Sequence, residues 1–178
     1  KAVNKLHEMS FLVYNLVIFP MIAGILIVNK DFVNFFLGQD FQDARYAIAI
    51  MAFRMFFIGW TNIMGIQILI PHNKNREFML STTIPAVFSV GLNLLLIPPL
   101  GYIGASIVSV ATEGLVWLIQ LYFTRSYLKE VKILPSMLKI LLAALLMYGA
   151  LYSVQAFMHF SSVVNVLIYS LLEIGRAH

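Results

Sequence analysis

The sequence contains five long apolar runs, each long enough to cross a lipid bilayer as an α-helix. A helix needs about 20 mainly apolar residues to span a hydrocarbon core about 30 Å thick. The runs are Phe11–Asn29, Ala44–Ile70, Phe78–Pro98, Gly101–Phe123 and Ser136–Met158. A sixth run begins near Ser162 and is shorter. We therefore predict an all-α fold, a polytopic transmembrane helical bundle with five complete spans and one truncated span.

The composition excludes an ordinary soluble domain. Of the 178 residues, 61% are hydrophobic and 11% are charged, and the mean hydropathy is +0.87. Soluble domains carry about 45–50% apolar and about 25% charged residues. The runs also lack the alternation of polar and apolar residues that a membrane β-barrel requires. Both observations favour membrane-spanning helices.

The charges between the apolar runs alternate along the chain. The N-terminal stub and the links after the second and fourth runs are basic, and they contain Lys1, Lys5, Lys74, Arg76, Arg125, Lys129 and Lys132. The intervening links are acidic, uncharged or carry only His159. Because cytoplasmic loops are enriched in Lys and Arg, the sequence predicts a cytoplasmic N-terminal stub. The first, third and fifth spans then run outward.

Several classes of function are not expected. The chain has no cysteine, so disulfides and thiol chemistry are excluded. Its net charge of +4 comes from residues in short links and forms no basic stripe, so a nucleic-acid partner is not expected. No zinc-protease, serine-hydrolase or phosphate-loop pattern is present. We expect no enzymatic activity, no cofactor and no metal ion.

Small and polar residues recur on one face of the second, third and fourth runs. At about 100° per residue, the aligned residues are Ala47, Arg54, Thr61 and Gly65, then Thr82, Ala86, Ser89 and Asn93, then Ser106, Ser109, Glu113 and Gln120. Such faces occur where helices pack closely, and also where they line a wet cavity. Both readings remain open. The substrate-cavity candidates are Arg54, Thr61, Asn62, Ser89, Asn93, Ser109 and Glu113.

Arg54 and Glu113 are the two ionisable residues within these faces. Charged side chains inside a membrane are costly and rarely face lipid. The two lie 10 and 12 positions from the start of spans that run in the same direction, so their depths differ by about 3 Å. An ion pair between the second and fourth spans is therefore possible, and so is contact of Arg54 with an anionic substrate. The two roles are compatible.

A set of short motifs in residues 10–125 resembles one transporter family. The motifs are Pro20 inside a span, Phe36 with Gly38, residues 67–71 from Gln67 to Pro71, residues 93–98 from Asn93 to Pro98, and then Gly101, Gly104, Ala105 and Glu113. In order and spacing they resemble the polysaccharide biosynthesis flippases of the multidrug/oligosaccharidyl-lipid/polysaccharide exporter superfamily.

The resemblance implies a division of the chain. Residues 1–135 would be four helices of the second lobe of a two-lobe transporter, and residues 136–172 an additional helix pair whose second member is truncated. The tail 173–178 can be encoded by the start of a common sequencing adapter, so we expect it to be an artefact. The natural protein is then expected to extend beyond both ends of this sequence.

The resemblance also implies a function. The family flips undecaprenyl-diphosphate-linked oligosaccharides across the bacterial cytoplasmic membrane for surface polysaccharide synthesis, and it makes and breaks no covalent bond. The implied partners are that lipid-linked substrate, the bilayer, and an N-terminal lobe of the same chain that the sequence lacks. Two alternatives stay open, a cation-coupled multidrug exporter of the same superfamily and a membrane polysaccharide polymerase or acyltransferase.

Overall fold

The computed structural model describes residues 2–129 and, beyond them, residues 138, 140–142, 145–146, 148–149 and 153. In this part of the chain every regular element is a helix. The elements are α1 (Ala2–Phe36), the 3-10 helix η1 (Gln39–Phe41), α2 (Ala44–Asn62), the π-helix η2 (Ile63–Leu69) and α3 (Asn75–Leu128). The all-α prediction is confirmed for these residues.

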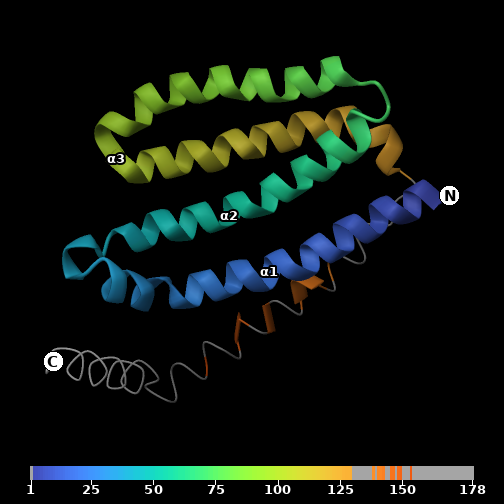
Figure 1. The fold of residues 1–178 in the computed structure, drawn as a ribbon. Coiled ribbons are helices and arrows are strands. Elements are labelled where there is room, and N and C mark those ends of the chain that lie inside the picture. The colour runs from blue at the N-terminus through green and yellow to red at the C-terminus, as the bar shows by residue number, and fades with distance from the viewer. Residues whose placement is uncertain are drawn as a thin grey trace, which may run out of the picture.

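The longest helix, α3, is a hairpin of two arms, residues 75–100 and 102–128. Its fold-back point is Gly101, whose φ of 54° and ψ of −132° are not helical. Glycine adopts a positive φ at little cost, and Pro98 and Pro99, three and two residues before it, disfavour continuation of the first arm. The hairpin is visible at the left of Figure 1.

Three of the described helices are long and apolar enough to cross a membrane, whereas the sequence predicts five complete spans. The numbers differ in part because α3 contains the predicted third and fourth spans in a single element. Each arm of α3 is longer than the about 20 residues that a crossing requires. The predicted fifth span falls mostly outside the described residues, and the sixth span and the tail 173–178 fall wholly outside them. The count of five stays a prediction.

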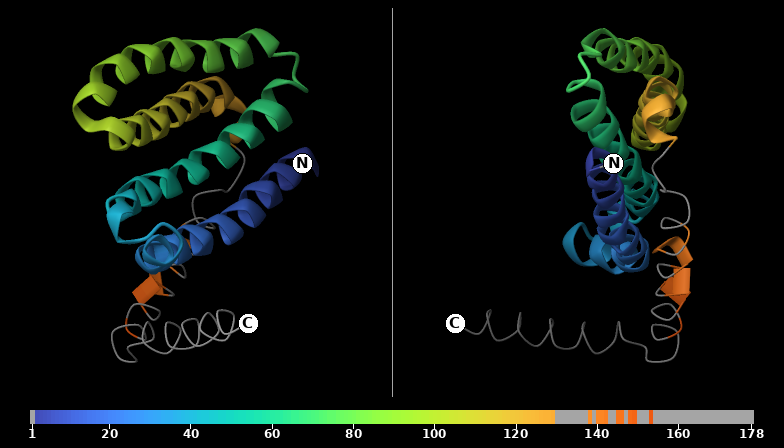
Figure 2. Two further views of the ribbon diagram at one scale, coloured as in Figure 1. Left: turned by 60° about the vertical axis from the view of Figure 1, so that its left-hand side comes forward. Right: turned by 90° about the vertical axis from the view of Figure 1, so that its right-hand side faces the viewer.

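The helices lie side by side in the order α1, α2, second arm of α3, first arm of α3 (Figures 1 and 2). The N-terminus of α1, the turn at residues 70–74 and the C-terminal end of α3 share one end of the molecule. The loop at residues 37–43 and the fold-back at Gly101 share the other end. The described basic links therefore gather at one end, as the alternating charges require.

Aromatic side chains hold α1 against α2. Phe11 and Trp60 are buried with ring centroids 4.8 Å apart, in a cluster with Ile63 and Met64. The ring of Tyr14 lies directly against Gly59, where an added Cβ would come within 1.8 Å of it. The interface between α1 and α2 thus depends on one position without a side chain.

The predicted span Ala44–Ile70 is present as α2 followed by η2. Gly65, inside η2, lies under Phe78 of α3, and a Cβ on Gly65 would come within 2.6 Å of that ring. After η2 the chain turns through Asn73, whose φ is 58°. At this turn Lys74 donates to Glu77 over 2.9 Å, and this hydrogen bond raises the pKa of Lys74. The close approach at Gly65 holds η2 against the start of α3.

Candidate functional site

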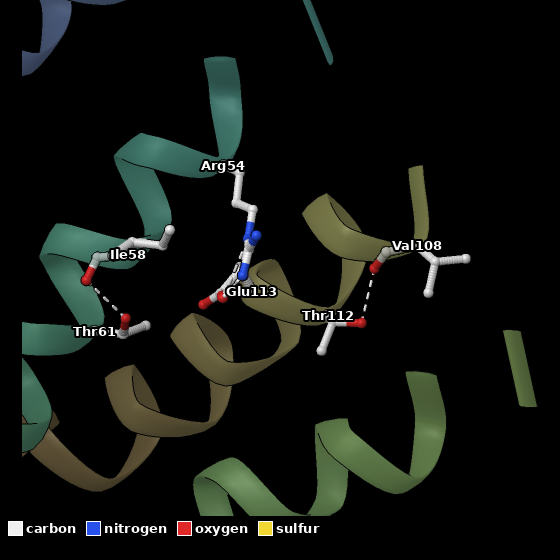
Figure 3. Close-up of polar contacts among 6 residues, drawn as sticks. All are labelled: Arg54, Ile58, Thr61, Val108, Thr112 and Glu113. Atoms are coloured by element: carbon white, nitrogen blue, oxygen red, sulfur yellow. Dashed lines mark hydrogen bonds and ion pairs between the residues drawn. The ribbon is translucent and has the colours of Figure 1, made fainter. Parts of the chain in front are cut away.

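Arg54 of α2 and Glu113 of α3 form an ion pair. Both Nη2 and Nε of the guanidinium donate to Oε1 of the carboxylate, over 2.9 and 3.3 Å (Figure 3). The side chain of Arg54 is 36% exposed and that of Glu113 is 21% exposed. The pairing that the sequence allows is therefore present, and the charged groups are only partly covered by the described residues.

The two charges reach each other because α2 and the second arm of α3 are adjacent (Figure 1). One turn further along each helix, Phe57 and Trp117 lie with ring centroids 5.8 Å apart. The ring of Phe57 also contacts Gly114, whose added Cβ would lie 3.8 Å from it. Aromatic packing therefore fixes the spacing of the two helices next to the ion pair.

An apolar cavity of about 400 Å³ lies on one side of this arrangement. Phe53 and Phe57, one residue before and three residues after Arg54, line it together with residues of α1 and with Leu141 and Leu145. Arg54 itself turns toward Glu113 and does not line the cavity. Helix α2 thus carries both the ion-paired Arg54 and part of the wall of an apolar cavity.

The other five candidates are spread over the helices. Thr61 is 8% exposed and donates to the carbonyl of Ile58 over 2.9 Å (Figure 3). Ser89 is half-buried and donates to the carbonyl of Ala86 over 2.9 Å. Ser and Thr hydroxyls commonly bond to a carbonyl one turn earlier in their own helix, so these two bonds fit helix packing and a cavity wall equally.

Asn93 and Ser109 are half-buried, and Asn62 is exposed. Asn62 lines a separate groove between α1 and α2. Among the seven candidates, all of them described residues, the structure joins only Arg54 and Glu113 by a hydrogen bond or ion pair. A shared cavity lined by all seven stays a prediction.

Two buried polar contacts were not predicted from the sequence. Asn15 of α1 accepts a hydrogen bond from the indole N–H of Trp60 over 3.1 Å. Gln120 in the second arm of α3 donates to Ser81 in the first arm over 3.2 Å. Asn15 and Gln120 are each 1% exposed. The sequence did offer one signal for these contacts, an amide side chain inside an apolar run, because such a group needs a hydrogen-bond partner in a membrane.

Within the described part of the chain, no group of three or more His, Asp or Glu side chains is arranged to hold a metal ion.

Comparison with known proteins gives two relatives. A protein of Escherichia coli named "Putative O-antigen transporter" is 29% identical over 135 residues, which cover 70% of this chain and 31% of the relative. An uncharacterized membrane protein of Methanocaldococcus jannaschii is 27% identical over 130 residues, which cover 73% of this chain and 25% of the relative.

The chain is a multi-pass membrane protein. Membrane-protein relatives and three long apolar helices agree on this point. The similarity to a transporter favours a transport function. The chain spans less than a third of the length of these relatives. No family model matches it, and neither does any solved structure.

Proposed function

We propose that the protein flips undecaprenyl-diphosphate-linked oligosaccharides across a bacterial cytoplasmic membrane, for the synthesis of a surface polysaccharide. The observation that carries the proposal is the partly exposed ion pair of Arg54 with Glu113 inside apolar helices. The name of the Escherichia coli relative supports it, because an O-antigen is a surface polysaccharide.

A diphosphate that crosses a bilayer needs a compensating cation, since a bare anion in hydrocarbon is prohibitively unstable. Arginine keeps its charge at all physiological pH values, and its planar set of N–H donors matches phosphate oxygens. Glu113 engages Nε and Nη2 through a single oxygen, so the guanidinium has more donors than this carboxylate uses. Arg54 is thereby suited to bind phosphate while Glu113 orients it between transport cycles.

The apolar cavity suits the other half of such a substrate. Its lining is built from aromatic and aliphatic side chains such as Phe19, Phe56 and Leu145. An isoprenoid chain can enter such a cavity without leaving apolar surroundings, because these side chains are about as apolar as lipid tails. An N-terminal lobe of the same protein would supply the opposite wall of the translocation pathway, and no covalent bond is made or broken.

Substitutions of Arg54 in the full-length protein test the proposal. Arg54→Ala is expected to abolish polymer export while the protein stays at its normal level in the membrane. Arg54→Lys retains part of the export because the charge persists without the planar donor set. Glu113→Gln costs less export than Arg54→Ala. Normal export by the Arg54→Ala variant would contradict the proposal.

A further inference from the structure

A groove of about 660 Å³ runs between α1 and the end of α2, separate from the ion pair. It is lined by Leu6, Met9, Ser10, Val13, Tyr14 and Val17 of α1 and by Gly59, Asn62, Ile63 and Gln67 of α2 and η2. Leu6 and Val17 are eleven residues apart, so the groove follows α1 for about 17 Å. It therefore extends over about half the thickness of a bilayer core.

The groove carries two exposed amides within helices that otherwise suit lipid. Asn62 and Gln67 are both exposed in the structure, and both lie in the apolar segment Ala44–Leu69. An amide without a hydrogen-bond partner in hydrocarbon is costly, and Asn and Gln in membrane helices typically bond across to a neighbouring helix. Lipid is therefore a poor cover for the part of this face around Asn62, which lies seven residues before the end of that segment, whereas Gln67 lies two residues before it.

Water is a poor cover as well, because most of the side chains that line the groove are apolar. Leu6 is 62%, Met9 55%, Val13 54% and Val17 53% exposed. These side chains form one continuous strip along α1, and the strip holds no charged residue. An apolar strip edged by two amides has the chemistry of a helix-packing surface.

The floor of the groove is shaped for close approach. The Tyr14 ring lies against Gly59, where no side chain holds it away from α2. Ser10 is one of the smallest side chains of the lining. Small residues at such surfaces let a membrane helix pack with its backbone near its neighbours.

We propose that this groove seats one further transmembrane helix of the same membrane protein, contributed from outside residues 1–178. The relatives are more than three times as long as the segment they share with this chain, so most of each relative lies outside that segment, and a corresponding part of this protein would be the source of such a helix. The seated helix carries small residues where it crosses Tyr14 and a hydrogen-bonding side chain that meets Asn62 or Gln67. The inference concerns helix packing and does not depend on the substrate.

A matched control surface lies on the first arm of α3. Val87 is 70%, Val90 61% and Leu94 74% exposed. Their spacing of three and four residues places them on one helix face, which is as exposed as the groove and lacks its amides. This face is expected to contact lipid.

Photocrosslinking in the full-length protein tests the inference. A benzophenone side chain replaces Val13 in one variant and Leu94 in the other, and both are illuminated in native membranes. The expected result is an adduct from position 13 to a peptide of the same monomer outside residues 1–178. No such adduct is expected from position 94. An adduct from position 13 to lipid alone, to a second copy or to residues 1–178 would overturn the proposal.

Thiol labelling distinguishes a seated helix from a water-filled groove. In a cysteine-free full-length background, Asn62→Cys and Gln67→Cys are treated with a water-soluble thiol reagent in opened membranes, with Lys74→Cys as the accessible control. Protection of positions 62 and 67 with labelling of position 74 is expected. Labelling of position 62 as complete as that of position 74 would show water in the groove and overturn the proposal.

Discussion

The indole N–H of Trp60 donates a hydrogen bond to Oδ1 of Asn15 over 3.1 Å, and so joins α2 to α1 inside an apolar interface. The amide of Asn15 is oriented by its own donation to the carbonyl of Phe11 over 2.8 Å. With Asn15 only 1% exposed, neither lipid headgroup nor water is available to replace the partner. The contact is therefore a specific determinant of how these two helices are aligned.

Trp60→Phe is expected to lower the free energy of unfolding in detergent through the lost hydrogen bond, by about 0.6 kcal/mol on average and at most about 1.7 kcal/mol for interhelical bonds in membranes. Asn15→Leu is expected to be destabilising as well. In the double variant the two effects are expected not to add, because each single change already breaks the same contact. Purely additive effects in denaturation measurements would contradict this role.

Gly59 of α2 and Gly24 of α1 give a pair of substitutions that differ in what surrounds the added methyl group. A Cβ on Gly59 would lie 1.8 Å from Cζ of Tyr14, whereas Gly24 has no atom within 4 Å of its added Cβ. Gly59→Ala is expected to displace Tyr14, break its hydrogen bond to the carbonyl of Met55 and lower the midpoint of thermal unfolding. Gly24→Ala is expected to be neutral or to stabilise α1 by up to about 1 kcal/mol. Equal midpoints for the two variants would contradict the packing described here.

The helices themselves were largely predictable from hydropathy, but their ends were not. The prediction Phe11–Asn29 is shorter than the observed α1, Ala2–Phe36, because hydropathy falls where charges appear while the helix continues. The span Ala44–Ile70 was predicted with almost the observed bounds. Its change to a π-helix at Ile63–Leu69 was not, because hydropathy carries no information on hydrogen-bond register.

The candidate site was predictable in part. The depths of Arg54 and Glu113 in parallel spans allowed their pairing, and the structure contains it. Thr61 lies on the same face of its helix as Arg54 but is buried. Periodicity places residues on a face without saying which neighbour covers it. The partnership of Asn15 with Trp60 was missed for the same reason, since it depends on the rotation of α1 against α2.

The membrane orientation is a further prediction from the basic links. Single cysteines at the positions of Gln39, Asn75 and Pro99 are introduced into a cysteine-free full-length protein in sealed cells. A membrane-impermeant thiol reagent is expected to label positions 39 and 99 from outside and to spare position 75, because cytoplasmic loops carry the Lys and Arg residues. Labelling of position 75 with protection of the other two would reverse the orientation.

The ion pair itself has two possible roles, which make different predictions for abundance. If Arg54 and Glu113 only hold α2 against α3, each single change leaves a charge without its partner and lowers the amount of protein in the membrane. Replacing both by apolar residues then restores abundance and export together, since buried pairs are often replaceable by apolar packing. If Arg54 binds substrate, the variant with both residues replaced keeps its abundance in the membrane but loses export.

The double variant Arg54→Met with Glu113→Leu is therefore the most direct measurement, made in the full-length protein with polymer export and membrane abundance determined on the same cells. The substrate-binding account predicts normal abundance with export lost, because the cation that meets the diphosphate is gone. Export at the parent's rate would contradict it and leave the pair a structural contact between α2 and α3.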